Sequence, residues 1–417
     1  MSTGAESSFV LRSMDAGDRG PALDVFWRAM GWGARTEDAD AVFADRAIEV
    51  DRTFVSLDTD SGEIVGTTSA YSLTMSMPGG ALVPVAGVYL VGVEPTHRRR
   101  GVMSSMMRHQ LKGLANGGEA VAALWTTDPA IYQRFGYGLA TWRSRIELDL
   151  ARAMFSPRAD ALASASCARL RQMSVADALP HLAAVHEEIV GSRPGVLARS
   201  ESRWNFLMRL EDGEPEVVVA MGPEGPVGYV AYRIRPGQSC ASPGGEVEVQ
   251  EISAVDPATH AQLWRYLLGL DLMRTVSAHR PLPDPLVHLL VDLRHLHATI
   301  DDALWVRLVD LPRAFGQRAF AAPIDLVLEV TDAVLPANAG RWRVSVDAAG
   351  EPAAARPTRG DADLSLDISD LGAAHLGATH LADLALAGRV HEHTPGALAA
   401  ASLAWSWSPI ATCPEIF

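Results

Sequence analysis

Apolar residues recur along the chain with two different periods, and their succession predicts a mixed α/β protein. In the first 150 residues, alternation of apolar and polar positions predicts strands, and i, i+3, i+4 spacing predicts helices. Strands are expected at 9–14, 53–58, 63–75, 81–93, 121–126 and 142–150, and helices at 21–30 and 101–115. The sequence Asp60-Ser61-Gly62 predicts a hairpin turn between the second and third strands.

The middle third repeats this order of elements. Strands are expected at 168–173, 216–221, 227–234 and 247–255, and helices at 175–190 and 257–270. A strand, Gly92-Val-Glu-Pro95 and a helix in the first part match a strand, Ala254-Val-Asp-Pro257 and a helix here. We interpret this match as an internal duplication, in which the second copy lacks the arginines that follow the first.

The last 120 residues change character. Alternating strands are expected at 325–331, 342–346 and 363–368, followed by short Ala/Leu-rich helices that end with 395–403. Such helices over a small sheet enclose either a core or a lipid pocket, and we favour the core. The chain is therefore expected to hold three domains, at 1–150, 151–298 and 299–417.

Composition narrows the class of partner. The formal net charge is −14, from 50 acidic and 36 basic side chains, which argues against nucleic acid and suits a cationic substrate. Cys167, Cys240 and Cys413 are too scattered for a disulfide framework or a zinc site. No apolar run is long enough for a membrane span, and the N-terminus lacks a Sec-type pattern. We expect a cytoplasmic protein, with export by another route as the alternative.

The strongest chemical signal is Val91-Gly-Val-Glu-Pro-Thr-His-Arg-Arg-Arg-Gly-Val-Met103. A strand ends, a basic loop follows, and Gly101 opens a helix whose first N–H groups are free to bind an anion. Arginines in the loop add charge-assisted contacts, so the expected ligand is a pyrophosphate. The pattern fits neither a P-loop nor a dinucleotide fingerprint. The alternative is a solvated basic loop before an ordinary helix.

The segment Arg98-x-x-Gly101-Val resembles the coenzyme A motif, Q/R-x-x-G-x-G/A, of the GNAT superfamily, with Met103 at its last position. Residues 95–101, 131–138 and 415–417 resemble the enhanced intracellular survival (Eis) acetyltransferases, as do 268–273 and 302–312. The resemblance implies two GNAT-type domains, the second degenerate, and a C-terminal sterol-carrier-protein-like domain. It also implies a homohexamer, a trimer of dimers, that acetylates amines of small cationic substrates such as aminoglycosides with acetyl-CoA.

The resemblance also assigns residues to acetyl-CoA. The backbone of Val91 and Val93 is expected to pair with the pantetheine arm, and Thr127 to lie near the thioester. The residues expected to hold the pyrophosphate at the helix start are Arg98, Arg99, Gly101 and Val102.

For catalysis, the resemblance makes Tyr132 the general acid, with Tyr137 as the alternative, and the terminal carboxylate of Phe417 the base. Tyr89, Trp32 and Glu415 are expected to line the acceptor pocket, beside the acidic segment 32–51. The implied reaction is direct attack of the amine on the thioester, without a covalent enzyme intermediate.

Two other functions stay open: a protein lysine or N-terminal acetyltransferase, and a non-catalytic lipid-binding or scaffold protein. His391 and His393 are two residues apart, so they do not share a face of a helix, and His295 with His297 has no carboxylate or cysteine cluster nearby in sequence. We therefore expect no metal site.

Overall fold

The computed structural model describes residues 8–32, 35, 48–209, 213–237, 244–282 and 284–417. The described chain forms three mixed or antiparallel sheets with helices packed on them, which confirms the mixed α/β class. It divides into two compact units. Unit 1 holds 1–140, 304–407 and 416–417, and unit 2 holds 141–303 and 408–415. No helix in the described residues is long and apolar enough to cross a membrane.

The first sheet, in unit 1, has the strand order β1-β2-β3-β4-β5-β14-β6. Its strands are β1 (Phe9–Ser13), β2 (Phe54–Asp58), β3 (Ile64–Ser76), β4 (Leu82–Val93), β5 (Val121–Leu124), β14 (Trp305–Leu308) and β6 (Gly138–Leu139). All neighbours are antiparallel except β4 and β5. The helices are α1 (Arg19–Met30), α3 (Val102–Ala115) and the short α4 (Pro129–Tyr132).

Helix α3 covers the first sheet with the apolar face that its spacing predicts. Met106, Met107 and Leu111 are fully buried on this face. The helix lies so close to β3 that a Cβ on Gly66 would stand 2.8 Å from a methyl group of Val102. This close packing fixes the start of α3 against the sheet.

The second sheet, in unit 2, repeats the first with the order β8-β9-β10-β11-β12-β7-β13. Its strands are β8 (Arg169–Met173), β9 (Glu216–Met221), β10 (Pro226–Arg235), β11 (Gly245–Ala254), β12 (Met273–Pro281), β7 (Trp142–Asp149) and β13 (Leu296–Asp302). Again a single pair, β11 with β12, is parallel. The helices are α5 (Pro157–Ser164), α6 (Val175–Ile189), α7 (Glu201–Arg209) and α8 (Pro257–Leu268).

Two strands lie in a different sheet from the one that their sequence position suggests. Strand β7, expected with the first 150 residues, pairs with β12 and β13 in unit 2. Strand β14, expected with the last part of the chain, pairs with β5 and β6 in unit 1. Each lies at the equivalent position in its sheet, next to the parallel pair of strands. Local alternation of apolar and polar residues does not indicate which strand will be the neighbour.

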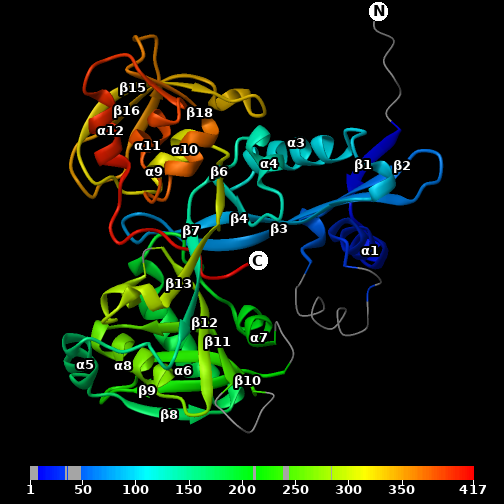
Figure 1. Cartoon of the computed structure of the whole chain (residues 1–417). Helices are drawn as coiled ribbons and strands as arrows, with labels where there is room; N and C mark the ends of the chain where they lie inside the picture. Colours follow the sequence, from blue (N-terminus) through cyan, green and yellow to red (C-terminus); the bar gives the residue numbers. More distant parts are fainter. Residues whose placement is uncertain (1–7, 33–34, 36–47, 210–212, 238–243, 283) are drawn as a thin grey trace, which may run out of the picture. The chain divides into compact units, whose positions relative to one another are not determined.

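The rest of unit 1 is a five-stranded sheet with the order β17-β16-β15-β18-β19. Its strands are β15 (Ile324–Thr331), β16 (Gly340–Val346), β17 (Ala354–Pro357), β18 (Leu364–Asp367) and β19 (Val390–Glu392). Its helices are α9 (Leu311–Gly316), α10 (Ile368–Ala374), α11 (Leu381–Leu386) and α12 (Ala397–Trp405). In Figure 1 these helices gather around the sheet in the yellow-to-red part of the colour scale. Phe315, Phe320 and Trp405 pack edge to face in its core.

Helix α10 also packs on β6 and β14 of the first sheet, within unit 1. A side chain at Gly138 would collide with the backbone of Ser369 and Ala373, and one at Gly372 with the carbonyl of Val306. Glycine therefore allows the closest approach of α10 to the first sheet, and this contact holds the C-terminal part of unit 1 against that sheet.

Candidate active site

Strand β4 continues past the point where its parallel neighbour stops. It pairs with β5 only from Val85 to Val88, because β5 ends at Leu124. On the other side, the register with β3 shifts between Thr67 and Ser69, and Leu90 takes a positive φ of 54°. Residues 89–93 of β4 therefore offer backbone N–H and C=O groups that no described strand pairs with on the β5 side.

The basic loop and the start of α3 close one end of this opening. Gly101 is the N-cap of α3 with φ 88°, and no side chain caps the helix. The first hydrogen bond of the helix runs from the amide of Ser105 to the carbonyl of Gly101. The amides of Val102, Met103 and Ser104 precede it, so they lack partners within the helix and carry the positive end of its dipole.

Two further contacts set the shape of the basic loop. Arg99 takes the left-handed conformation, with φ 62°, and Nη2 of Arg98 donates to the carbonyl of Ala29 at 2.7 Å. His97 precedes the arginines, and its Nε2 lies 3.1 Å from Oδ2 of Asp58 on β2. Hydrogen bonds from the Ser61 and Asp60 amides and from His97 hold the pKa of Asp58 at about 2 despite partial desolvation. The sequence reasoning missed this anchor, because the partners stand 39 residues apart.

These elements surround one pocket of about 690 Å³ in unit 1. Eight residues that the sequence analysis assigned to the cofactor or to catalysis line it: Val91, Val93, Arg98, Arg99, Gly101, Val102, Thr127 and Tyr132. The end of α1, at Ala29 and Met30, also lines it, and sequence reasoning gave no sign of this. The structure thus brings together a free strand edge, an uncapped helix start, two arginines and a phenol.

Acetyl-CoA carries amide groups along its pantetheine arm and a pyrophosphate, and both fit groups in this pocket. The free edge of β4 can exchange hydrogen bonds with amides, as a further strand would. The uncapped amides of α3 can bind phosphate oxygens. A side chain in place of Gly101 meets nothing within 4 Å, so the glycine is needed for its backbone conformation and not for space.

Tyr132, the candidate general acid, ends α4 and is buried, with 8% of its surface exposed. Burial, together with the nearby Asp128, raises the pKa of Tyr132 above its usual value. Tyr137, the alternative, lies edge to face with it at 6.0 Å, but it is fully buried and does not line the pocket. This difference in access favours Tyr132 as the residue that meets a substrate.

The last residue, Phe417, is buried in unit 1 against β4. The position that a Cβ on Gly87 would take stands 3.0 Å from Cε2 of the Phe417 ring. Two residues further along the strand, Tyr89 is also buried, and its ring stacks on Tyr71 with centroids 3.6 Å apart. The chain end and this aromatic pair therefore adjoin the same strand that lines the pocket.

Trp32 and Glu415, also expected at the acceptor pocket, are not among the residues that line this pocket. Trp32 is 53% exposed and packs edge to face on Trp27. Within unit 2, Arg199 and Arg203 donate to the carboxylate of Glu415 at 3.1 and 2.8 Å, and Glu415 is 4% exposed. This double ion pair gives Glu415 a role in anchoring the C-terminal segment.

Most of the acidic segment 32–51 lies outside the described residues. Of its last residues, Glu49 accepts hydrogen bonds from the amide and hydroxyl of Ser72 at 2.7 and 2.6 Å. Its carboxylate thus ties the segment just before β2 to Ser72 on β3.

The histidine pairs do not form a ligand set. His295 ends a short 3-10 helix, whereas His297 belongs to β13, and Nε2 of His393 lies 3.0 Å from the hydroxyl of Ser365. Among the described residues, no three His, Cys, Asp or Glu side chains gather as metal ligands would.

Known proteins resemble this chain in each of its parts. Profiles of the acetyltransferase (GNAT) domain match residues 11–140 and 195–308, and a profile of the sterol carrier protein domain matches 311–414. These matches confirm the expected two GNAT domains and sterol-carrier-like domain. An uncharacterized N-acetyltransferase of Streptomyces avermitilis is 41% identical over 393 residues, 92% of this chain and 93% of the relative.

Mycobacterial proteins are also similar along most of their length. N-acetyltransferase Eis of Mycobacterium tuberculosis is 32% identical over 338 residues, which cover 79% of each chain. The crystal structure of Eis1 from Mycobacterium abscessus superposes with a TM-score of 0.82 at 31% identity, covering 98% of this chain and all of that one. From its sequence and its fold, this chain belongs to the Eis family of N-acetyltransferases, within the GNAT superfamily.

Proposed function

We propose that this enzyme transfers the acetyl group of acetyl-CoA to an amine of a small cationic substrate, with aminoglycosides as the first class to test. The observation that carries the proposal is the pocket of about 690 Å³ in unit 1, where the free edge of β4, the start of α3 and Tyr132 meet. The fold of the family implies use of acetyl-CoA. The excess of 50 acidic over 36 basic side chains favours a cationic acceptor.

Binding of acetyl-CoA would involve three parts of the chain. The backbone at Val91 and Val93 would pair with the pantetheine amides, and Thr127 would lie beside the acyl group. The amides at the start of α3 would bind the pyrophosphate, with Arg99 adding a charge-assisted contact. One N–H group of Arg98 donates to the carbonyl of Ala29, so Arg98 would contribute both to binding of the ligand and to the shape of the loop.

The thioester supplies an electrophilic carbonyl carbon and a sulfur leaving group. Tyr132 would hold the proton that this sulfur needs, on Oη. Burial raises the pKa of Tyr132, which keeps the phenol protonated at neutral pH but makes it a weaker acid. A thiolate in the same apolar pocket is also a stronger base than one in water, so burial shifts donor and acceptor in the same direction.

The terminal carboxylate of Phe417 would receive the proton of the amine, directly or through water. A model carboxylate with a pKa of about 3.3–3.7 is a weak base, so its main effect would be to attract and orient an ammonium group. Support comes from the burial of the Phe417 ring at Gly87, which directs the last residue to β4. No nucleophilic side chain is required for direct transfer.

We also propose assembly as a homohexamer, a trimer of dimers. Beyond the resemblance, the support is exposed apolar surface on the sterol-carrier-like part. Helices α11 and α12 pack on each other, and Leu386 and Leu403 on them are 90% and 61% exposed. Light scattering at micromolar concentration should give six chains per particle, whereas a stable monomer would contradict this proposal.

The test of function is release of CoA from acetyl-CoA in the presence of aminoglycosides, polyamines and lysine-containing peptides. Turnover restricted to the aminoglycosides or polyamines supports the proposal. Turnover restricted to the peptides favours a protein acetyltransferase. Stoichiometric binding of acetyl-CoA without turnover on any amine favours a binding or scaffold role.

A further inference from the structure

Unit 2 holds a second pocket, of about 720 Å³, in the position that corresponds to the first one. Strand β11 pairs with β12 only as far as Val249 and Ala278, so its residues 250–254 have no described partner on that side. The pocket is lined by this free edge, by the start of α8 and by the end of β12. The duplicated fold has therefore kept the opening between its two parallel strands.

The phosphate-binding end of this second opening is closed by the chain itself. Asp256 is the N-cap of α8, and its carboxylate accepts from the amide of Thr259 at 2.9 Å and from its hydroxyl at 2.6 Å. The Asp256 carboxylate thus caps the start of α8, whereas no side chain caps the corresponding start of α3. No basic loop precedes α8, so this end does not suit a pyrophosphate.

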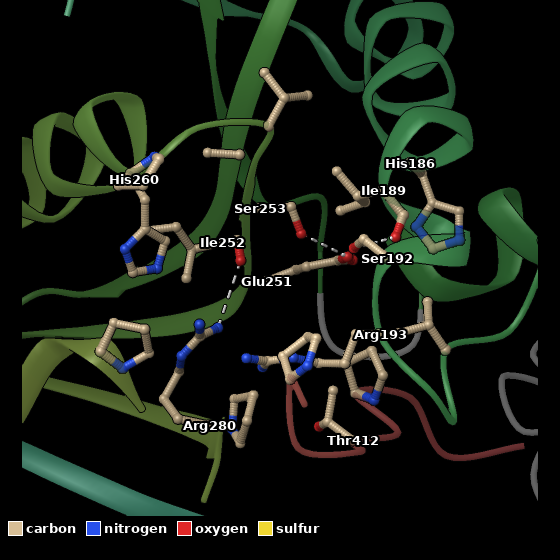
Figure 2. A pocket seen from close by; sticks show the side chains of 18 of the residues that line it. His186, Ile189, Ser192, Arg193, Glu251, Ile252, Ser253, His260, Arg280 and Thr412 are labelled. Atoms are coloured by element: carbon tan, nitrogen blue, oxygen red, sulfur yellow. Dashed lines mark hydrogen bonds between the residues drawn. The ribbon is translucent and has the colours of Figure 1, made fainter. Parts of the chain in front are cut away.

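The other end of the pocket is positively charged. Figure 2 shows Arg280, from β12, and Arg193, from the loop after α6, reaching into the pocket toward each other. Arg280 donates to Asp284 at 2.8 Å and is held beside the carbonyl of Ile252. Among the described residues, no hydrogen bond or ion pair engages the guanidinium of Arg193. Burial and the neighbouring Arg280 lower the pKa of Arg193, whereas Asp284 raises it.

The carboxylates that line this pocket do not neutralise the positive charge of Arg193. Glu251 is bound by Arg199 at 2.9 Å and by the hydroxyl of Tyr229 at 2.7 Å. Asp256 caps its helix, and Glu188 is exposed. His260 adds no further positive charge at neutral pH, because burial and Arg280 lower its pKa to about 4 and leave the imidazole neutral.

We propose that this pocket binds a small organic oxyanion between the guanidinium groups of Arg193 and Arg280. Paired guanidinium groups suit the oxygen geometry of a carboxylate or a phosphate ester. The volume far exceeds that of an inorganic ion, and Ile189, Val196 and Ile252 supply apolar walls. The ligand therefore carries an apolar body on its charged head. The second GNAT domain, which lacks a pyrophosphate site, is in this view a binding domain of its own.

The test is isothermal titration of the full-length protein with three probes: sodium octanoate, octyl phosphate and inorganic phosphate. We expect one site per chain for at least one octyl probe, with inorganic phosphate weaker, and the stronger octyl probe identifies the head group. Arg193→Gln should weaken binding about 10- to 100-fold, since it removes one charge-assisted contact. Arg171→Gln, which removes an exposed arginine on β8 of the same unit, is the matched control and should bind normally.

The melting temperature separates a binding defect from a folding defect. Arg193→Gln removes a cation that faces another cation, so the ligand-free variant should melt no lower than the wild-type protein. Absence of binding by all three probes would overturn the proposal, as would equal affinity in the Arg193→Gln and Arg171→Gln variants. Loss of octyl-probe binding in the Arg98→Ala, Arg99→Ala double variant would move the site to unit 1 and also refute it.

Discussion

The guanidinium of Arg307 and the carboxylate of Asp332 form a fully buried ion pair near Tyr137. Their closest atoms, Nη2 and Oδ2, stand 2.6 Å apart. Asp332 also accepts from the amides of Val334 and Leu335. Arg307 partly offsets the rise that burial causes in the pKa of Tyr137, the residue on which Tyr132 packs. The pair links β14 to the segment that follows β15, and Arg307 also lies against Gly136, next to Tyr137.

Removing Asp332 should therefore be strongly destabilising. Asp332→Ala leaves Arg307 buried without its counterion, which typically costs about 3–5 kcal/mol. Urea unfolding should show this loss. Asp325→Ala is the matched control, because it breaks an ion pair with Arg343 whose side chains are 62% and 51% exposed. The control should change stability little, and an equally small effect of Asp332→Ala would contradict the importance of the buried pair.

The double variant Arg98→Ala, Arg99→Ala should raise the KM for acetyl-CoA about tenfold or more. Each charge-assisted contact to phosphate contributes about 1.5–3 kcal/mol, and the loop also loses its bond to Ala29. Arg108→Ala changes an exposed arginine on α3 and should leave this KM unaltered. A normal KM in the double variant would show that the pyrophosphate binds elsewhere.

Tyr132→Phe keeps the ring and removes the proton donor. If Tyr132 is the general acid, kcat should fall about 10²- to 10⁴-fold while acetyl-CoA binding persists. Tyr137→Phe is the control, since this fully buried residue does not line the pocket. Because burial raises the pKa of Tyr132, the phenol stays protonated well above neutral pH, and deprotonation of this group should cause no loss of rate below about pH 10. Full activity of Tyr132→Phe would assign the proton to another group or to water.

Extension of the chain by a few glycines tests the role of Phe417. The added residues move the terminal carboxylate by up to about 3.3–3.6 Å each, while Ile416 and the ring of Phe417 remain in place. A catalytic terminus predicts a large loss of kcat with a nearly unchanged melting temperature. Activity that survives wherever folding survives would instead make Phe417 a structural anchor. Amidation of the terminus, introduced by ligation, removes the charge without adding length and should give the same result.

Calorimetric titration should find one acetyl-CoA per chain. The second GNAT domain offers an α8 start that is already capped by Asp256 and has no basic loop before it. Arg98→Ala, Arg99→Ala should abolish or weaken the single binding event, and Asp256→Asn should leave it unchanged. Two sites per chain, or a site that responds to Asp256→Asn alone, would show that the second domain binds the coenzyme.

The sequence by itself determined the local elements and the chemistry that they carry. Periodicity predicted α3 and many strands of the two GNAT domains, but not β6, β12, β13 or β14, because an element that buries one face has apolar residues at the spacing of that face. The duplication followed from the match between Gly92-Val-Glu-Pro95 and Ala254-Val-Asp-Pro257. The loop from Arg98 to Gly101 could also be identified as a candidate anion site from the sequence, because the first amides of a helix lack partners within the helix in any fold. Eight of the expected residues line one pocket: the loop and helix-start residues were expected from their chemistry, whereas others, such as Thr127 and Tyr132, came from the resemblance to the family.

Only the tertiary structure decided which strands and side chains meet across long separations. Alternation marks β7 as a strand and gives no sign of β14, and the choice of sheet depends on which open edge their residues can complete and on the packing of α10 against β14. Likewise, the sequence gives no sign that Glu415 forms ion pairs with Arg199 and Arg203, which precede it by more than 200 residues. Charge and burial arise from contacts between distant segments, which short-range patterns do not encode.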